Sequence, residues 1–280
     1  MFVIKPVQRT LVGEAAILLG VTAGSGTAAS IGRFNGFFDA SVMGSSISSP
    51  RANVGSGVLS NIAYMFGGTL ISGGAQSSAI SNYNGTSYST NLAALGAART
   101  TPAVTPLSSA LYIFGGGSSA AATSAIQHFT PDTCSNDSAT LSQSKTQCVA
   151  ATLSSLAYVF GGSITGGTYS TRIETYDAAT CSVFSTALPT PTVRDVAVLS
   201  GTVYNATWKF NGSILAATGM GWSGSGQMAV VNGKIYLLPS SSGAIQSSDG
   251  TTVSTTALSS SFASSSNNPA CVFTQQAVLV

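Results

Sequence analysis

The chain has 280 residues and a formal net charge of +2, and only 6% of its residues are Asp, Glu, Lys or Arg. Phosphate groups are bound by clustered Lys and Arg, so this composition excludes nucleic acid as an expected partner. Hydrophobic residues make up 44% of the chain, which excludes a disordered protein, and their runs are too short to cross a bilayer. We therefore expect no membrane insertion and a large β core.

The amino terminus has Lys5 and Arg9 ahead of an apolar stretch from Leu11 to Gly24. This order superficially resembles a secretory signal, in which a basic segment precedes an apolar one. Glu14 interrupts the apolar stretch and Met1 is retained, so we expect no cleaved signal peptide.

An apolar run that ends in a glycine pair occurs three times, at Tyr64–Gly68, Tyr112–Gly116 and Tyr158–Gly162, with starts 48 and 46 residues apart. Ala16–Gly20 is a weaker earlier copy with one glycine. A period in this range indicates repeated supersecondary units, as in propellers and solenoids. Glycine suits a backbone that turns sharply or approaches a neighbour closely. No Lys-Ser/Thr or helix start follows the pairs, which disfavours a phosphate loop. We interpret as structural the repeat glycines Gly20, Gly67, Gly68, Gly115, Gly116, Gly161 and Gly162.

Two further markers share this period. A basic residue and a short β run open four of the units, three of which go on to a glycine pair, and these basic residues are Arg51, Arg99, Lys145 and Arg194. An aromatic residue and a turn pair come later in each unit, and the turn pairs are Asn35-Gly36, Asn84-Gly85, Thr130-Pro131 and Asp177-Ala178. Such pairs between alternating apolar residues are typical of hairpins. The basic residues either converge on the axis of a ring or brace adjacent strands, and we favour bracing.

The last two units are less regular. Val203–Thr207 is followed closely by Phe210-Asn211-Gly212, so the fifth unit is expected to lack its long loop. Met228–Leu238 predicts a sixth strand pair joined at Asn232-Gly233, and Ser240–Asn268 is expected to hold the outer strands of that unit.

Cys271–Val280 has the pattern of a strand that opens a repeat, but no glycine pair follows it. We expect this strand to pair with the first unit near the amino terminus. That pairing would close a ring and remove exposed sheet edges, which otherwise invite aggregation.

These markers resemble the kelch repeat, whose units of about 50 residues build four-stranded blades. The resemblance implies an all-β fold, with one β-propeller domain over residues 1–280 and six four-stranded kelch-like blades. Five or seven blades remain open, because the fifth unit is short and the sixth is irregular. Kelch repeats usually place a Trp after the aromatic turn, where this chain has Tyr88, Cys134 and Cys181. The packing of the outer strands must therefore differ.

Candidate catalytic groups are few. His128 is the one histidine, which excludes zinc sites that use two or three, and also the copper-radical oxidases built on kelch-like propellers. We interpret His128 as a packing or surface residue. Glycosidases need two carboxylates about 5–10 Å apart, whereas Glu174 and Asp177 have the pattern of solvated turn groups. Asp195 follows Arg194 and is expected to pair locally with it. We expect no enzyme, and hence no catalytic residue, metal or cofactor.

The cysteines are Cys134, Cys148, Cys181 and Cys271. Cys134 and Cys181 occupy the same position in different repeats, which places them too far apart to bond. Cys134 and Cys148 are close in sequence, so a disulfide between them stays open, although we expect free thiols.

The function that these observations favour is a non-enzymatic structural or adhesive protein of an extracellular particle, such as a bacteriophage tail, neck or capsid-surface protein. Its expected location is the virion, and its expected partners are other virion subunits and a host-surface glycan. The candidate binding residues lie in loops after the glycine pairs, namely Thr69, Ser72, Ser118, Ser119, Ser163, Thr165, Thr168 and Tyr169. Loops of this kind vary without disturbing the blades.

Two other classes of function remain. One is a cellular or secreted kelch-type interaction module or adhesin. The other is a carbohydrate-active propeller enzyme, either an epimerase or a sialidase-like hydrolase. The enzyme requires carboxylates and arginines that converge on the ring axis, and Arg172 with Glu174 is its best pair.

Overall fold

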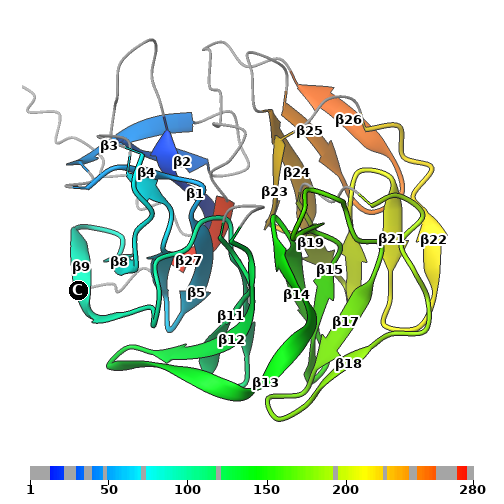
Figure 1. Cartoon of the computed structure of the whole chain (residues 1–280). Helices are drawn as coiled ribbons and strands as arrows, with labels where there is room; N and C mark the ends of the chain where they lie inside the picture. The colour runs from blue at the N-terminus through cyan, green and yellow to red at the C-terminus, as the bar shows by residue number, and fades with distance from the viewer. Residues whose placement is uncertain are drawn as a thin grey trace, which may run out of the picture.

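Figure 1 shows the computed structural model of the chain, in which every described element is a β-strand. The structure describes residues 13–21, 30–34, 40–46, 49–70, 74–117, 121–191, 195–222, 226–239, 245–256 and 270–275. Within these ranges no helix is long and apolar enough to cross a membrane.

The described strands form six large antiparallel sheets. The first contains β27 (Ala270–Gln275), β1 (Gly13–Val21), β2 (Ser30–Phe34) and β3 (Ala40–Ser46). The second contains β5 (Gly55–Leu59), β6 (Ile62–Phe66), β8 (Ala79–Tyr83) and β9 (Tyr88–Ala94). The third contains β10 (Ala103–Leu107), β11 (Ala110–Phe114), β12 (Thr123–Thr130) and β13 (Thr133–Thr146).

The remaining three sheets follow the same order. The fourth contains β14 (Val149–Leu153), β15 (Leu156–Phe160), β17 (Ile173–Tyr176) and β18 (Cys181–Val183). The fifth contains β19 (Ala197–Leu199), β20 (Thr202–Tyr204), β21 (Trp208–Phe210) and β22 (Leu215–Ala217). The sixth contains β23 (Gly226–Val231), β24 (Lys234–Pro239), β25 (Ile245–Ser248) and β26 (Val253–Thr256).

Three short strands complete the described structure. β16 (Ser163–Ile164) pairs with the end of β13, so five large sheets have four strands and the third has five. β4 (Arg51–Ala52) pairs with β7 (Thr69–Leu70).

The six sheets are the blades of a β-propeller, and we number them as above. Their innermost strands contact one another in the order β5, β10, β14, β19, β23, β27 and back to β5, which closes the ring (Figure 1). β27 pairs with β1 from Gly13↔Gln275 to Leu18↔Ala270. The predicted propeller, the number of six blades and the closure by the two terminal strands are therefore confirmed.

The turn pairs lie between the third and fourth strands, as expected. Asn84-Gly85 separates β8 from β9, Thr130-Pro131 joins β12 to β13, and Asp177-Ala178 separates β17 from β18. The side chain of Asp177 shows why these residue types recur, because its Oδ1 accepts the N–H groups of Ala179 (2.9 Å) and Thr180 (2.6 Å). Asn35-Gly36 lies outside the described residues.

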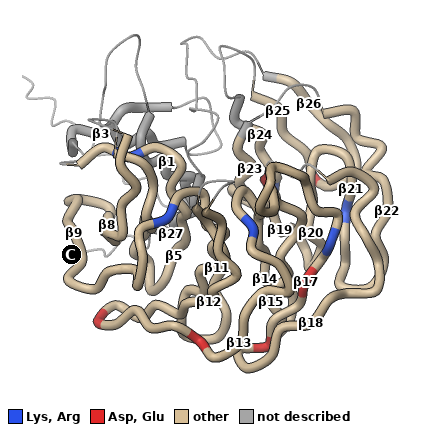
Figure 2. The backbone as a smooth tube through the Cα atoms, in the orientation of Figure 1, with Lys and Arg blue, Asp and Glu red and all other residues tan. Residues whose placement is uncertain are grey.

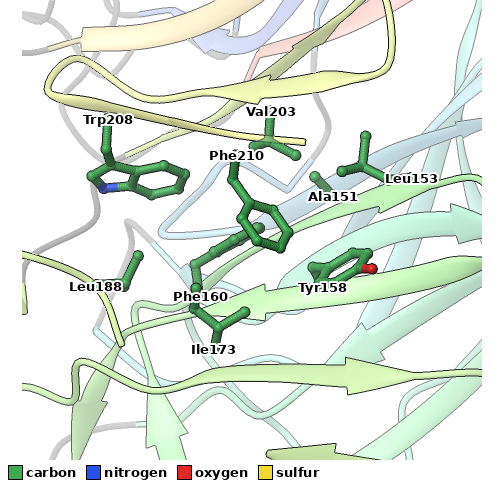
Figure 3. Close-up of a cluster of buried hydrophobic side chains, with 9 residues drawn as sticks. All are labelled: Ala151, Leu153, Tyr158, Phe160, Ile173, Leu188, Val203, Trp208 and Phe210. Atoms are coloured by element: carbon green, nitrogen blue, oxygen red, sulfur yellow. The ribbon is translucent and has the colours of Figure 1, made fainter. Parts of the chain in front are cut away.

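The core lies between the blades. Figure 3 shows the cluster between blades 4 and 5, where Phe160 and Tyr158 of β15 face Trp208 and Phe210 of β21. The ring centroids of Phe160 and Trp208 lie 5.1 Å apart, and those of Tyr158 and Phe210 lie 5.0 Å apart. Burial of each such side chain stabilises the fold by roughly 1.5–3 kcal/mol. The repeat aromatics therefore hold neighbouring blades together.

Candidate binding face

Strand direction places two kinds of loop at one end of each blade. Adjacent strands are antiparallel, so the segment that enters the innermost strand lies at the same end as the loop between the second and third strands. In blades 2 to 4 this end contains the entering segments 49–54, 96–102 and 146–148 and the described parts of the glycine-pair loops, which are 67–70, 74–78, 115–117, 121–122 and 161–172. We call this end the candidate binding face.

The glycine pairs hold the ends of the second strands against the backbone of the outer strands and of the segments that lead to the next blade. Both glycines of each pair have a positive φ, for example +63° and +99° at Gly67 and Gly68. The N–H of Gly68 donates to the carbonyl of Arg99 (2.9 Å), and the N–H of Gly116 donates to the carbonyl of Lys145 (2.9 Å). Glycine is required here because the backbone is left-handed and an added Cβ would lie against neighbouring backbone. The single earlier glycine, Gly20, lies in β1 beside a shift in register with β2.

The repeat arginines brace these loops. Arg51 is 2% exposed and donates to the carbonyls of Gly67 (2.6 Å) and Ala79 (2.5 Å) and to Ser81 Oγ (2.6 Å). Arg99 is also buried and donates to the carbonyl of Gly115 (3.0 Å). Bracing is therefore confirmed for these two arginines. Arg194 lies outside the described residues.

The basic residues Arg51, Arg99 and Lys145 are each followed by a residue with a strained backbone, and we call these three strained residues the ladder. Asn53, Thr101 and Gln147 have φ values of +59°, +47° and +55°, which non-glycine residues rarely adopt. The N–H of Thr101 donates to the carbonyl of Asn53 (2.6 Å), and the N–H of Gln147 donates to the carbonyl of Thr101 (3.3 Å). The three side chains are half-buried or exposed. They place neutral amide and hydroxyl groups side by side across blades 2 to 4, on the candidate binding face.

The predicted loop residues occupy different environments. Thr69 is half-buried in β7, and Ser163 is buried in β16. The structure brings together Thr165, Thr168 and Tyr169, whose side chains are exposed. Their turn is closed by the N–H of Ile164, which donates to the carbonyl of Thr168 (2.8 Å). Ser72, Ser118 and Ser119 lie outside the described residues.

The expectation that Glu174 is a solvated turn group is wrong. Glu174 lies within β17, is 0% exposed and forms an ion pair with the equally buried Lys145. Arg172 is exposed and donates to Ser142 Oγ (3.2 Å), so it does not form a pair with Glu174. The ion pair could not be predicted from the sequence, because Lys145 lies on a different blade from Glu174. Figure 2 shows how few charged residues the described chain carries.

His128 belongs to a network that the sequence did not suggest. Its Nδ1 lies 2.7 Å from Asp137 Oδ1, while the Tyr176 hydroxyl donates to Asp137 Oδ2 (2.7 Å). A carboxylate only accepts, so Nδ1 carries the proton that His128 donates. Burial and the Asp137 contact raise the pKa of Tyr176, which keeps the phenol protonated. The network joins blade 3 to blade 4.

Among the described residues, no group of three or more His, Cys, Asp or Glu is arranged to hold a metal ion.

Cys134, Cys148 and Cys181 are free thiols. Cys134 pairs with Phe129 and Cys181 pairs with Tyr176, which confirms that the two cysteines occupy the same repeat position. Burial raises the pKa of Cys134 and of Cys148 to about 11 and that of Cys181 to about 12. These thiols are therefore protonated at neutral pH and are poor nucleophiles.

Asp195 makes stability depend on pH. Its carboxylate accepts the N–H groups of Val196 (2.9 Å) and Met228 (2.6 Å), yet burial raises its pKa to about 7. Between about pH 4 and pH 7 the folded state holds a proton that the unfolded state has lost, so stability falls as pH rises through this interval. We expect the free energy of unfolding to fall by about 1–2 kcal/mol across this interval. This value is smaller than the full pKa change implies, because Asp195 is half-buried and solvent screens its charge. Urea titrations across this range measure the effect, and Asp195→Asn should flatten the profile. An equal slope in both proteins would contradict the assignment. The expected pair with Arg194 lies outside the described residues.

Comparison with known proteins adds support for the fold. No protein-family model matches the chain, and no curated protein matches it. Among solved structures, the chain is similar to the one titled "Structure of YjhT", with a TM-score of 0.57 and 10% identity over 68% of this chain and 73% of that chain. The chain is a β-propeller. At this identity the likeness shows the fold alone.

Proposed function

We propose that this propeller is a non-enzymatic, kelch-like binding module that contacts its ligand through the candidate binding face. The observation that carries the proposal is the contrast in polarity at this face. Arg51, Arg99 and Lys145 are buried and bonded within the protein, whereas the exposed side chains of Gln147 and Tyr169 are neutral. A surface of this kind offers hydrogen bonds and an aromatic ring but little charge.

The ligand that suits this face is a neutral polar surface, either a host glycan or a protein neighbour. Gln147 offers an amide, and Thr165 and Thr168 offer hydroxyl groups. Tyr169 is 46% exposed and offers a ring with a polar tip, a combination enriched at binding surfaces. These groups are donors and acceptors that can pair with sugar hydroxyls or backbone amides.

We place the module on an extracellular particle, as a tail, neck or capsid-surface component of a bacteriophage virion. The support is compositional, because only 6% of the residues are charged and the segments after the glycine pairs are rich in Gly, Ser and Ala. Immunogold electron microscopy of particles from the source culture, with antibody to the purified propeller, tests this location. Label on discrete sites of virions is expected. Label confined to cells would overturn the virion role and favour a cellular module or adhesin.

The binding face itself is tested with Tyr169→Ala and Gln147→Gly, measured on an array of neutral and acidic glycans and by pull-down of purified particles. Each variant should weaken binding by about five- to thirtyfold, since a lost aromatic or amide anchor costs roughly 1–2 kcal/mol. Both side chains are exposed, so thermal stability should not fall. Val183→Ser is the matched control, because Val183 is a 51% exposed residue on the outermost strand of blade 4. Equal binding by all proteins would contradict the proposed face.

The carbohydrate-active enzyme is the weaker alternative. It needs Glu174 as a carboxylate available to substrate, together with an arginine. Glu174 is 0% exposed and is committed to Lys145, while Arg172 is exposed and bonds Ser142. This arrangement supports the non-enzymatic proposal.

A further inference from the structure

A lysine and a glutamate meet at the seam between blades 3 and 4. Lys145 comes from the end of β13, and Glu174 comes from the middle of β17. Lys145 Nζ contacts Glu174 Oε1, and both side chains are 0% exposed. Two opposite charges are therefore held together without solvent.

The seam around this pair is apolar. The cluster packed there includes Leu141, Cys148, Val159 and Tyr176, all of them buried. Removing an ammonium and a carboxylate from water is costly, and their mutual attraction offsets that cost only in part. A reaction that removes both charges is therefore favoured in this environment.

The second oxygen of Glu174 is held by hydrogen-bond donors. Oε2 accepts the N–H of Ser142 (2.6 Å) and the S–H of Cys181 (3.6 Å). Donors fixed on one carboxyl oxygen stabilise the negative charge that grows there when a nucleophile attacks the carbon. The other oxygen, Oε1, faces the lysine. Because a carboxyl oxygen lies about 1.2 Å from its carbon, a nitrogen in contact with Oε1 is near the attack distance of about 3–3.5 Å from Cδ.

We propose that Lys145 and Glu174 condense to an intramolecular amide bond that joins blade 3 to blade 4. One proton passes from Nζ to Oε1, which gives the neutral amine and the neutral acid. Nζ then attacks Cδ, the Nζ–Cδ bond forms, and the charge on Oε2 is held by Ser142 and Cys181. The Cδ–Oε1 bond breaks, and Oε1 leaves as water with the acid proton and a second proton from Nζ. The remaining proton stays on the amide nitrogen.

The reaction requires an amine, and Lys145 supplies one. The equivalent residues ahead of the innermost strands of blades 2 and 3 are Arg51 and Arg99, whose guanidinium groups stay charged and do not act as nucleophiles. Among these three basic residues, Lys145 combines an amine with a buried carboxylate partner. The bond would make a propeller that resists opening at this seam, independently of what the candidate binding face binds.

The mass of the intact protein and a tryptic map test the bond directly. The expected mass is lower than that of the sequence by one water. Trypsin cleaves after free Arg99, Lys145 and Arg172 but not after an acylated lysine. The bonded protein should therefore give residues 100–172 as one peptide, linked to residues 173–194. The full sequence mass together with separate peptides 100–145, 146–172 and 173–194 would overturn the proposal.

Two variants and one control variant test which residues form the bond. Lys145→Arg keeps the ion pair and the tryptic site but removes the nucleophile, so it should show the full mass and separated peptides. Cys181→Ala removes one donor from Oε2 and should lower the linked fraction in freshly purified protein, whereas Cys134→Ala, at the same position of blade 3, should leave it unchanged. A water loss that persists in Lys145→Arg would assign the lost water to another site and contradict the proposal.

Discussion

Gly67→Ala is expected to lower the free energy of unfolding by about 3–5 kcal/mol, among the largest effects of any single methyl group in this protein. Gly67 has φ +63°, and an added Cβ would lie 2.3 Å from the carbonyl oxygen of Arg99. That oxygen belongs to the backbone of the neighbouring blade and already accepts the N–H of Gly68. It cannot move without breaking the contact between the blades. Chemical denaturation followed by tryptophan fluorescence measures the loss.

Gly219→Ala is the matched control. Gly219 has nearly the same backbone angle, φ +64°, but nothing lies within 4 Å of an added Cβ. Its substitution should cost only the roughly 1–2 kcal/mol of a left-handed alanine. Similar losses at Gly67 and Gly219 would show that the backbone conformation, and not the close approach of the next blade, makes glycine necessary.

Arg51→Met is expected to cost about 3–5 kcal/mol, because it leaves several buried acceptors without a donor at once. The guanidinium of Arg51 is bonded to the carbonyls of Gly67 and Ala79 and to Ser81 Oγ. Methionine keeps much of the side-chain volume but supplies no donor. Unfolding in urea and hydrogen exchange at the amides of β6 and β8 measure the loss, and exchange should accelerate in blade 2 first.

Arg172→Met is the control for this substitution. Arg172 is exposed and makes one hydrogen bond to Ser142 Oγ. Solvent replaces that bond, so the expected change is within about 0.5 kcal/mol. If Arg51→Met were as mild as Arg172→Met, the buried arginine would not brace the glycine-pair loop.

The periodic features of the sequence predicted most of the fold. Glycine pairs 48 and 46 residues apart, each with a basic residue before it and a turn pair after it, predict repeated four-stranded units. Local chemistry makes this possible, since left-handed glycines and Asx turns depend on a few adjacent residues. The unpaired strand at 271–280 predicted the ring closure that β27 and β1 make.

The partners of the polar side chains could not be predicted in the same way. Glu174 lies three residues before the turn residue Asp177, and nothing near it in sequence marks it as buried. Its partner Lys145 lies on the preceding blade, as does Asp137, the partner of Tyr176. The ladder of Asn53, Thr101 and Gln147 likewise depends on hydrogen bonds between blades.

The sequence by itself therefore determined the repeat, its turns and its structural glycines, because each depends on backbone conformations that short segments specify. It also indicated the closed ring, because a strand at the end of the chain was left without a partner in its own unit. The tertiary structure alone decided which charges are buried in pairs, which loop groups face solvent and where a lysine meets a carboxylate. Those outcomes depend on how one blade packs against the next, and a strand's own alternation of residues does not encode its neighbour's side chains.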